Sequence, residues 1–370
     1  MNTRFYNPTE IRWMPWARVG ELLPGPHLRV MIVTGESSKA RGEQLRSEAL
    51  EDHDVRLLSG VPADPTDESV QGALDEVRAA DPDWLIAMGG GSVLDSAKAA
   101  AMLARNEGGV LDYVRDARQV IAPPIPLIAI PTTAGSGSEV TPYASMTDLG
   151  RMQKISLSHD WLYPRYAVFD PEPSLTCSAR QTAISGMDAL SHAIEGYWSN
   201  RSTPVTDAYA LVAAKLVSDV LPGAYDCPSD LESRRAMLHG SLLAGLTISN
   251  ARTTAVHAVS YPLTVNYQVP HGMACAMLLP SFIRYNEGAM GRTKERALLD
   301  RLEIDSMGGL ADSVESLKER TQIPQRLGEL GLGETDIKII VDNGFRPDRM
   351  ANNPREVTMH SLRNILESIL

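Results

Sequence analysis

The first half of the chain alternates short apolar runs with segments in which apolar residues recur every three or four positions. The runs have the length of buried strands, and the segments between them have the length of helices. Strands that alternate with helices favour a parallel sheet built from strand–helix–strand units. The expected strands lie within residues 29–35, 54–60, 83–92 and 125–133, and the expected helices lie within 38–50, 67–80 and directly after 92.

The pattern changes from about Thr176 onward. Strand-like runs almost disappear, and long segments of helical period follow one another, among them residues 203–224, 232–263 and 309–322. The sequence therefore predicts an α/β fold with a Rossmann-like parallel sheet in residues 1–176, followed by an all-helical domain in residues 177–370. Ligands of such proteins usually bind in a cleft between the domains, so we expect the functional site there.

Composition narrows the class of partner. The chain has 370 residues and a net charge of −11, with no apolar stretch of eighteen residues and no run of five basic residues. Neither a nucleic-acid nor a membrane partner is expected. The first residues lack the pattern of a secretion signal, and the cysteines are odd in number and far apart, which favours reduced thiols in a cytoplasmic protein. The oligomeric state stays open, with a homodimer as one alternative. The cysteines are Cys177, Cys227 and Cys275.

A glycine-rich loop follows one of the predicted strands. Gly89, Gly90, Gly91 and Ser92 stand between an apolar run and a helix that opens near Val93. Backbone without side chains lets an anion approach closely, and the N–H groups of a helix N-terminus favour phosphate. A tight turn without a ligand is the alternative.

A second loop of small residues follows the next predicted strand. It carries the hydroxyl groups of Thr132, Thr133, Ser136 and Ser138. One such loop is usually only a loop, but two at the carboxyl ends of strands in one sheet indicate a nucleotide site.

Residues 185–199, SGMDALSHAIEGYWS, set Asp188 and His192 four positions apart. On a helix this spacing puts both side chains on one face, where they can reach one metal ion, although a hydrogen-bonded surface pair is the commoner alternative. His257 and His271 are flanked by apolar residues, where an imidazole without a partner is unfavourable. One carboxylate and three imidazoles suit a divalent first-row metal that keeps a position open for substrate oxygen.

Several segments together resemble the iron-containing, or group III, alcohol dehydrogenase family. They stand in the family's order and spacing, and with the last nineteen residues they extend the resemblance over nearly the whole chain. It implies a nucleotide-binding α/β domain, a helical metal domain, and hydride transfer between a nicotinamide and a carbonyl or alcohol substrate. The segments are GGGSVLDSAKA, PTTAGSGSEVTPYA, FDPEPSLT, SGMDALSHAIEGY, VPHGMACAMLLPSFIRYN and NNPREVTMHSLRNILESIL.

The resemblance also implies a metal site. The ligand set suits Fe(II) first, with Zn(II), Mn(II) and Ni(II) compatible. Glu195 is expected to be a partner on the helix face and not a ligand. The implied ligands are Asp188, His192, His257 and His271.

The cofactor implied by the resemblance is NAD(H) or NADP(H). Gly35, with Ser37 nearby, stands where many NAD-preferring relatives carry an Asp that repels the 2′-phosphate of NADP, although Glu36 could still repel it. Lys154 matches a lysine that reaches the cofactor in relatives, with an ordinary exposed strand lysine as the alternative. The remaining cofactor positions are Gly90, Gly91, Ser92, Asp95, Thr132, Thr133 and Ser136.

Two departures from the family pattern bear on catalysis and substrate. Tyr261 stands where many relatives have a further histidine, so proton transfer at this point would fall to Tyr261 or to water. Arg252, Thr253 and Thr254, just before His257, would form a binding set for an anionic group, with an exposed helix arginine as the alternative. This pattern resembles the phosphonoacetaldehyde reductases, which form 2-hydroxyethylphosphonate. It implies a small anionic aldehyde or alcohol as substrate and a place in phosphonate biosynthesis.

Three other functions stay open. One is a general short-chain alcohol or aldehyde oxidoreductase of the same family. A dehydroquinate-synthase-like lyase would carry a Glu as first ligand, so Asp188 counts against it. A metal- and nucleotide-binding protein without turnover is favoured only by the missing histidine at Tyr261.

Overall fold

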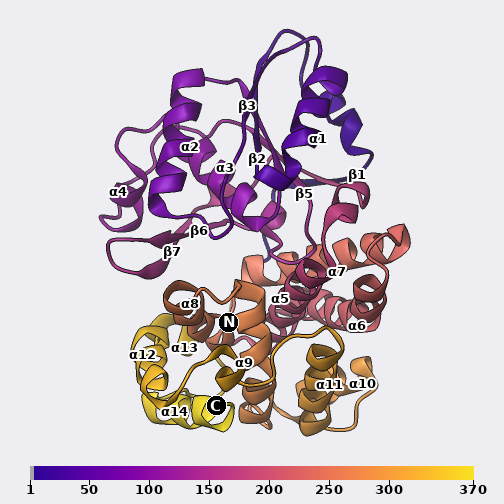
Figure 1. Cartoon of the computed structure of the whole chain (residues 1–370), viewed down its shortest axis with the longest axis vertical. Helices are drawn as coiled ribbons and strands as arrows, with labels where there is room; N and C mark the ends of the chain where they lie inside the picture. Colours follow the sequence, from indigo (N-terminus) through magenta and orange to yellow (C-terminus); the bar gives the residue numbers. More distant parts are fainter. Residues whose placement is uncertain (1–3) are drawn as a thin grey trace. The chain divides into compact units, whose positions relative to one another are not determined.

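The computed structural model describes residues 4–370, which fold into two compact units. An α/β unit contains residues 7–133 and 138–174, and a helical unit contains residues 175–370 together with 4–6 and 134–137. Both units are seen in Figure 1, with the strands in indigo and magenta and the later helices in orange and yellow. The predicted fold class, a parallel-sheet domain followed by a helical one, is confirmed. The boundaries 1–176 and 177–370 stay a prediction.

The sheet of the α/β unit is parallel throughout, with the strand order β1-β8-β5-β4-β2-β3. The four predicted strands correspond to β2, β3, β4 and β5. The sequence pattern did not reveal β1, β8, or the separate antiparallel pair β6–β7. The strands are β1 Glu10–Trp13, β2 Arg29–Thr34, β3 Asp54–Leu58, β4 Trp84–Gly89, β5 Leu127–Pro131, β6 Tyr143–Asp148, β7 Gln153–Ser158 and β8 Tyr166–Phe169.

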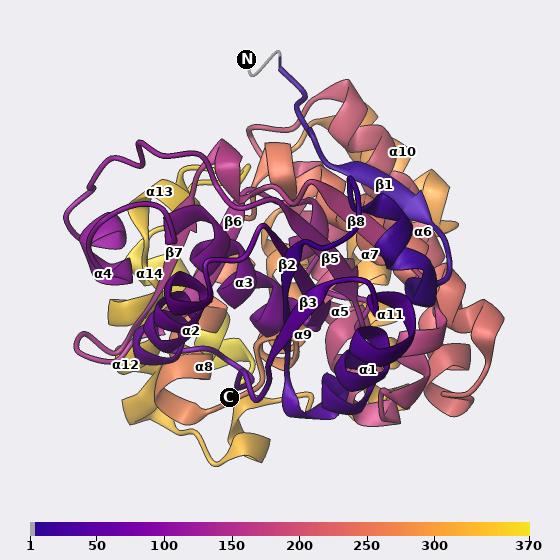
Figure 2. The ribbon, with the colours of Figure 1, turned by 90° about the horizontal axis from the view of Figure 1, so that it is seen from above.

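The central strands are apolar on both faces because helices cover both. Met31 and Val33 of β2 pack in one cluster with side chains of α2 and α3, while Val30 and Ile32 pack in a second cluster with Leu45, just after α1. Figures 1 and 2 show α1 and α2 on opposite sides of β2 and β3. The helices of this unit are α1 Lys39–Gln44, α2 Asp67–Ala80, α3 Gly91–Leu103 and α4 Val110–Val114.

Helix α2 begins and ends where its sequence dictates. The side chain of Thr66 accepts a hydrogen bond from the backbone N–H of Ser69, and Asp67 and Glu68 occupy the first turn, where a negative charge is favourable. The helix ends at Ala80, and the capping residue Asp81 adopts the left-handed conformation. These local signals explain why the predicted range of this helix, 67–80, agrees with the structure.

The strand order reverses next to β2. The chain passes from β2 to β3 on one side, and then β4 pairs with β2 on the other side. In open α/β sheets such a reversal opens a crevice at the carboxyl ends of the strands, where ligands bind. The loop that begins at Gly35 and the loop 89–92 follow the two strands at this point.

The helical unit is built around α5. Every residue of this helix from Thr182 to Trp198 is buried, because α6, α7 and α9 pack around it. Polar side chains on this helix must therefore find partners inside the protein. The helices are α5 Ala179–Trp198, α6 Pro204–Asp226, α7 Leu231–Ala251, α8 Ala255–Tyr267, α9 His271–Tyr285, α10 Arg292–Leu302, α11 Met307–Arg320, α12 Glu334–Gly344, α13 Pro347–Met350 and α14 Met359–Ser368.

The segment 232–263, helical in its sequence pattern, is two helices. Helix α7 ends at Ala251 and α8 starts at Ala255. The break arises because the Glu195 carboxylate accepts hydrogen bonds from the backbone N–H groups of Thr254 and Val256, which removes them from a continuous helical ladder. Apolar periodicity alone does not reveal such a break.

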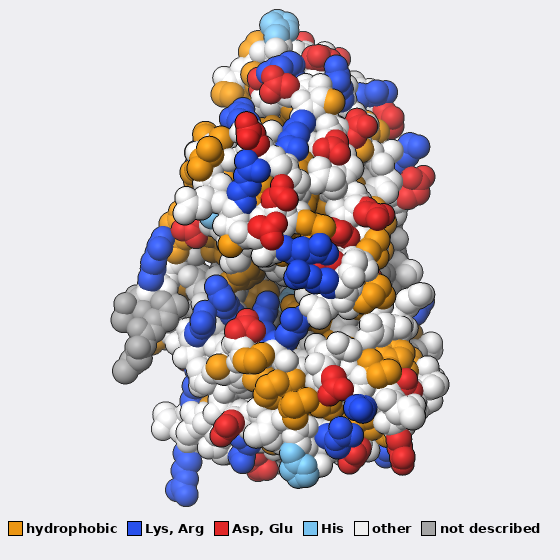
Figure 3. Space-filling model, turned by 90° about the vertical axis from the view of Figure 1, so that its left-hand side faces the viewer, with side chains coloured by type: hydrophobic (Ala, Val, Ile, Leu, Met, Phe, Trp, Pro, Cys, Tyr) orange, Lys and Arg blue, Asp and Glu red, His pale blue; other side chains and the backbone are white. Residues whose placement is uncertain are grey.

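The surface of the α/β unit has the mixed charge typical of a solvated face. Acidic and basic side chains are interspersed over the part of it seen in Figure 3. Within residues 4–370, no helix combines the length and the apolar character needed to cross a bilayer.

Candidate metal centre and cofactor loops

Four predicted ligands converge within the helical unit. Helix α5 supplies Asp188 and His192, α8 supplies His257, and α9 begins at His271. The Nε2 atoms of the three imidazoles face one carboxylate oxygen, Oδ1 of Asp188. Their distances to it are 4.0 Å for His192, 3.5 Å for His257 and 3.8 Å for His271.

Hydrogen bonds at the other ring nitrogen orient each imidazole. Nδ1 of His192 lies 3.2 Å from the carbonyl oxygen of Gly135, and Nδ1 of His271 lies 3.3 Å from the hydroxyl of Ser260. Ser260 donates its proton to the carbonyl of His257, so it accepts from His271. Nδ1 of His257 faces the Glu195 carboxylate. A proton on each Nδ1 satisfies these contacts and would leave the Nε2 lone pairs free for a cation held between them and Asp188.

Two glycines allow the backbone to approach α5 closely enough to bring these groups together. A Cβ atom on Gly272 would clash with the carbonyl oxygen of Ile184 and lie 3.0 Å from Cβ of Asp188. A Cβ atom on Gly135 would lie 2.8 Å from Cβ of Ser185. Larger residues would push His271 and the Gly135 carbonyl away from their places.

The donor set fits a divalent cation. Oδ1 of Asp188 and Nε2 of His257 are buried without a hydrogen-bond partner among the described residues, an arrangement that is costly unless a ligand satisfies them. Donors about 2.0–2.3 Å from one metal ion stand roughly 3–3.6 Å apart. The measured separations are within a few tenths of an ångström of that range, so a small contraction would close the set around an ion.

The charges of the cluster are consistent with this. Burial alone would raise the pKa of the Asp188 carboxyl, but the positive charge that His192, His257 and His271 carry when protonated holds it below its ordinary value. Asp188 is therefore an anion at neutral pH, as a metal ligand must be.

Glu195 lies behind His257, on the side away from Asp188. Its Oε1 atom accepts from the backbone N–H groups of Thr254 (2.9 Å) and Val256 (3.1 Å) and from the Thr254 hydroxyl (2.6 Å). Burial would raise the pKa of this carboxyl, but His257 and these donors lower it. Glu195 thus positions His257 and is directed away from the predicted metal site. Its place one turn after His192, on the same face of α5, is the sequence signal for it.

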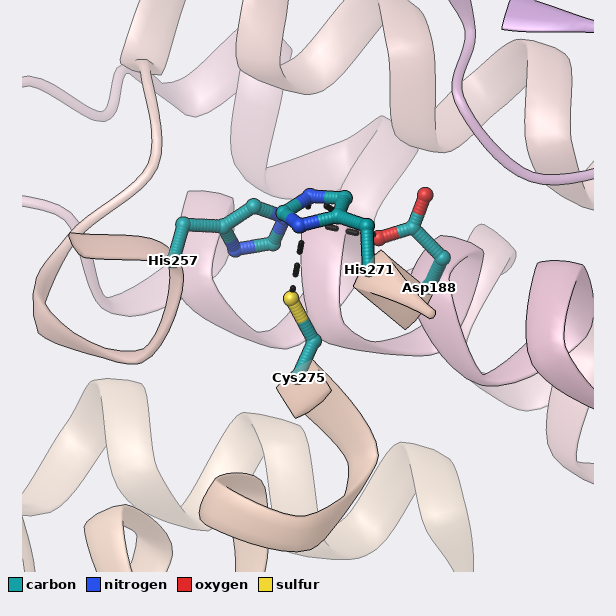
Figure 4. Close-up of side chains that lie close together, drawn as sticks. All are labelled: Asp188, His257, His271 and Cys275. Atoms are coloured by element: carbon teal, nitrogen blue, oxygen red, sulfur yellow. Dashed lines mark hydrogen bonds and ion pairs between the residues drawn. The ribbon is translucent and has the colours of Figure 1, made fainter. Parts of the chain in front are cut away.

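Cys275 also belongs to the cluster. Its sulfur, the carboxylate of Asp188 and the imidazole nitrogens of His257 and His271 lie within 4.8 Å of one another, as Figure 4 shows. The sequence analysis predicts only an ordinary reduced thiol at Cys275. The spacing of four residues after His271 is the signal that could have placed it.

Tyr261 lies beside the predicted ligands. Its ring stacks on that of His271 with centroids 5.8 Å apart, and it follows His257 by one helical turn on α8. Its role in proton transfer stays a prediction.

The three residues considered for substrate binding lie at the α7–α8 break. Arg252 is exposed, whereas Thr253 and Thr254 are buried. The Thr253 hydroxyl accepts from Arg349 (2.6 Å), and the Thr254 hydroxyl donates to Glu195 and accepts from Nε1 of Trp198 (2.9 Å). The structure therefore ties both hydroxyls to the protein, and Arg252 is the member of the set whose side chain reaches the surface.

The predicted cofactor loops meet at one edge of the sheet. Gly89 and Pro131 are paired at the ends of β4 and β5, and the N–H of Thr132 donates to the carbonyl of Gly89 (3.0 Å). A Cβ atom on Gly90 would lie 3.2 Å from the hydroxyl of Thr133. Helix α3 starts at Gly91, so the N–H groups of its first turn lie at this edge of the sheet, where a phosphate could bind them.

Buried charges support the neighbouring loop. Lys98 donates to the carbonyl of Ser138 (2.9 Å) and to that of Tyr143, and Asp95 accepts from the N–H of Ser145 (2.8 Å). Burial lowers the pKa of Lys98 to about 8 and raises the pKa of Glu139 to about 7. Asp95 therefore fixes the backbone at Ser145 inside the α/β unit, in addition to the cofactor contact predicted for it.

The remaining cofactor positions are distributed over both units. Lys154 lies on β7 with Nζ 3.7 Å from the Asp64 carboxylate, and burial lowers its pKa, so it is not the ordinary exposed lysine considered as an alternative. Ser92 accepts from the N–H of Asp64 (3.2 Å). Gly35 is buried and Ser37 exposed after β2, while Ser136 belongs to the helical unit.

Family models match both parts of the chain. One described as "Iron-containing alcohol dehydrogenase" matches residues 9–171, and one described as "Fe-containing alcohol dehydrogenase family, C-terminal" matches residues 182–370. The chain belongs to the iron-containing alcohol dehydrogenase family. It is accordingly an NAD(P)-linked, metal-dependent oxidoreductase of the type EC 1.1.1.-.

Individual relatives agree with this assignment. The NAD-dependent methanol dehydrogenase of Bacillus methanolicus is 33% identical over 326 residues, which cover 86% of this chain and 85% of the relative. The sulfoacetaldehyde reductase of Bilophila wadsworthia is 31% identical over 324 residues, covering 85% and 83%. The solved structure of sulfoacetaldehyde reductase from Bifidobacterium kashiwanohense in complex with NAD+ matches with a TM-score of 0.93 at 31% identity, covering 100% of this chain and 99% of that one.

Replacing Glu195 by Gln should weaken metal binding. An amide can present an oxygen to His257 or to the N–H groups of Thr254 and Val256, but not to both, so one donor loses its acceptor. We expect metal affinity to fall about 10- to 100-fold and the free energy of unfolding of the metal-free protein to fall by about 1–3 kcal/mol. Competition with a chelator and denaturant unfolding measure the two effects. Glu232→Gln, at an exposed position of α7, is the control, and equal metal affinity in both variants would contradict the positioning role.

Replacing Gly91 by Val should weaken nucleotide binding. A side chain at the first residue of α3 would occupy the space through which a phosphate reaches the helix N–H groups. We expect the dissociation constants of NADH and NADPH, measured by calorimetry, to rise by at least about tenfold, or roughly 1.4 kcal/mol. Gly72→Val on α2 is the control, since a Cβ atom at Gly72 meets nothing within 4 Å. Unchanged affinity at Gly91→Val would show that the loop is only a turn.

Proposed function

We propose that the protein reduces a small anionic aldehyde with NADH or NADPH, with phosphonoacetaldehyde as the leading substrate and 2-hydroxyethylphosphonate as the product. The observation that carries the anionic substrate is the backbone of Arg252, an arginine held in a strained conformation directly before the helix of a metal ligand. Such a product would place the enzyme in phosphonate biosynthesis.

Arg252 has φ 61° and ψ 167°, a region that residues with a side chain rarely adopt. Strain of this kind costs on the order of 1–3 kcal/mol and persists only where the surroundings enforce it, which is common at functional sites. Here Nδ2 of Asn352 donates to the carbonyls of both flanking residues, Ala251 (3.1 Å) and Thr253 (3.0 Å). The chain therefore fixes the direction in which Arg252 leaves the backbone.

A guanidinium fixed in this way suits a phosphonate, because its planar donors can bond two oxygens of the anion at once. The segment after Arg252 leads to the predicted metal ligands. Thr254, two residues on, donates to Glu195, and Glu195 orients His257. An anionic aldehyde would be held at its charged end by Arg252 and at its carbonyl end by the metal site.

The reaction needs little from the protein beyond this placement. When bound, the metal would supply Lewis acidity toward the substrate oxygen, and the nicotinamide would supply the hydride. The ion would be held by the carboxylate of Asp188 and by the imidazoles of His192, His257 and His271. Each imidazole would bind it through Nε2 and keep its proton on Nδ1. Tyr261, whose ring stacks on that of His271, would pass a proton to the product alcohol, with water as the alternative donor.

A sulfonate aldehyde is the second candidate. Two of the relatives found are described as sulfoacetaldehyde reductases, and sulfoacetaldehyde has the same length and also carries an anionic group of three oxygens. A general short-chain alcohol oxidoreductase is the third, supported by the relative described as a methanol dehydrogenase.

The cofactor form, metal and setting complete the proposal. Gly35 in place of an acidic residue would admit NADP(H) as well as NAD(H), with repulsion of the 2′-phosphate by Glu36 as the alternative. We expect Fe(II) as the metal, with Zn(II) as the alternative. The free thiols of Cys177, Cys227 and Cys275 support a reducing, cytoplasmic setting, and a homodimer is the assembly to examine first.

A substrate panel with defined metal loading tests the function. Metal-free protein is loaded with Fe(II) or Zn(II) and given phosphonoacetaldehyde, sulfoacetaldehyde and propanal with NADH or NADPH. We expect metal-dependent oxidation of the cofactor, fastest with the phosphonate. In His271→Ala turnover should be abolished while the circular dichroism spectrum stays native, because the ligands stand on helices with their own core. Turnover without added metal, or equal rates in His271→Ala, would contradict the metal-dependent mechanism.

Replacing Arg252 by Ala should lower catalytic efficiency for the anionic aldehyde by ten- to a hundredfold, on the order expected for one charge-assisted contact. For propanal it should change little. Arg252→Lys should recover part of the loss, since a point charge cannot bond two oxygens in the same plane. Arg252→Gly relieves the backbone strain and removes the charge, and Arg235→Ala on α7 is the control. Equal losses for charged and neutral aldehydes would assign Arg252 a structural role.

A further inference from the structure

We infer that Cys275 is a further ligand of the metal ion, so that the centre offers a thiolate beside one carboxylate and its imidazoles. The inference rests on the metal-dependent function proposed above. It adds a sulfur ligand to the four ligands that the sequence predicts.

The geometry comes from helix α9. His271 and Cys275 are four residues apart and therefore lie on one face, one turn from each other. Sγ of Cys275 lies 3.9 Å from Nε2 of His271, a separation close to those between Asp188 and the imidazoles. The pair on α9 repeats the arrangement of Asp188 and His192 on α5, and the two pairs face each other.

The sulfur faces polar atoms. Figure 4 shows it directed at the imidazole of His271, with Asp188 and His257 beyond, and all four ligand atoms lie within 4.8 Å of one another. A buried cysteine often serves as a small apolar side chain. That role does not explain a fully buried thiol next to Oδ1 of Asp188 and Nε2 of His257, two buried atoms for which residues 4–370 provide no hydrogen-bond partner.

Coordination would follow ordinary thiol chemistry. A divalent cation displaces the thiol proton, which passes to solvent, and a metal–sulfur bond forms with no change of oxidation state. A thiolate favours Zn(II) and Fe(II) over harder ions such as Mn(II) and Mg(II). Cys275 would therefore influence which metal ion the site binds. An ion with six coordination positions would still have one left for the substrate.

Cobalt substitution tests this directly. Metal-free full-length protein is loaded with one equivalent of Co(II), and its absorption is recorded for the wild type, Cys275→Ser, Cys177→Ser and Cys227→Ser. We expect a thiolate-to-cobalt charge-transfer band in the near ultraviolet for the wild type and both controls, and its loss in Cys275→Ser. A wild-type complex without the band, or a band that persists in Cys275→Ser, overturns the inference.

Metal affinity gives a second readout that does not depend on turnover. In competition with a chelator, Cys275→Ser should bind Zn(II) at least about tenfold more weakly, with a smaller loss for Mn(II). Equal losses for both ions would contradict a sulfur ligand. If the wild type binds no metal at all, the proposed function fails as well. If it binds one equivalent without the charge-transfer band, only the role of Cys275 fails.

Discussion

The contact between Glu195 and His257 is the constraint on which the rest of the helical unit depends. Helix α5 is buried on all sides, yet it carries the carboxylates of Asp188 and Glu195 and the imidazole of His192. Buried charges of one sign are tolerated only with partners. Glu195 finds them in Thr254, Val256 and His257, and by doing so it turns His257 toward Asp188. The buried helix thus has one carboxylate, Glu195, that is satisfied inside the protein, and one, Asp188, that a cation would satisfy.

The same contact shapes the backbone around it. Because Glu195 takes the N–H groups at the start of α8, α7 and α8 cannot continue as one helix. The short connection between them leaves Arg252 with a positive φ of 61°, and Asn352 bonds the carbonyls on both sides of it. The orientation of His257, a helix break and an arginine at the surface are therefore consequences of one carboxylate. A substitution at Glu195 would therefore affect all three of these features.

The sequence predicted those parts of the protein whose signals are local. The four strands that run from β2 to β5 and the helix α2 follow from apolar runs, capping residues and charges in the first turn. The metal ligands predicted on α5, Asp188 and His192, follow from a spacing of four residues, and the structure brings their side chains together. In contrast, β1 and β8 pair with each other although 152 residues separate Trp13 from the start of β8 at Tyr166, and four-residue strands of that kind carry too little pattern of their own. The spacing of Glu195 and Cys275 puts each on the same helix face as a predicted ligand, but the groups that each contacts come from other helices, which no single segment encodes.

The donor set of this centre also bears on how selective it can be. Carboxylate and imidazole donors alone bind several first-row ions in the general order of their affinities, so selectivity must come from geometry or from a softer ligand. The geometry here is supplied by rigid helices whose close approach depends on Gly272, since a Cβ atom at that position would meet Asp188 and the Ile184 carbonyl. The softer donor is available one turn along the same helix, at Cys275. Helix α9 therefore determines both the size of the site, through its glycine, and its chemical preference, through its thiol.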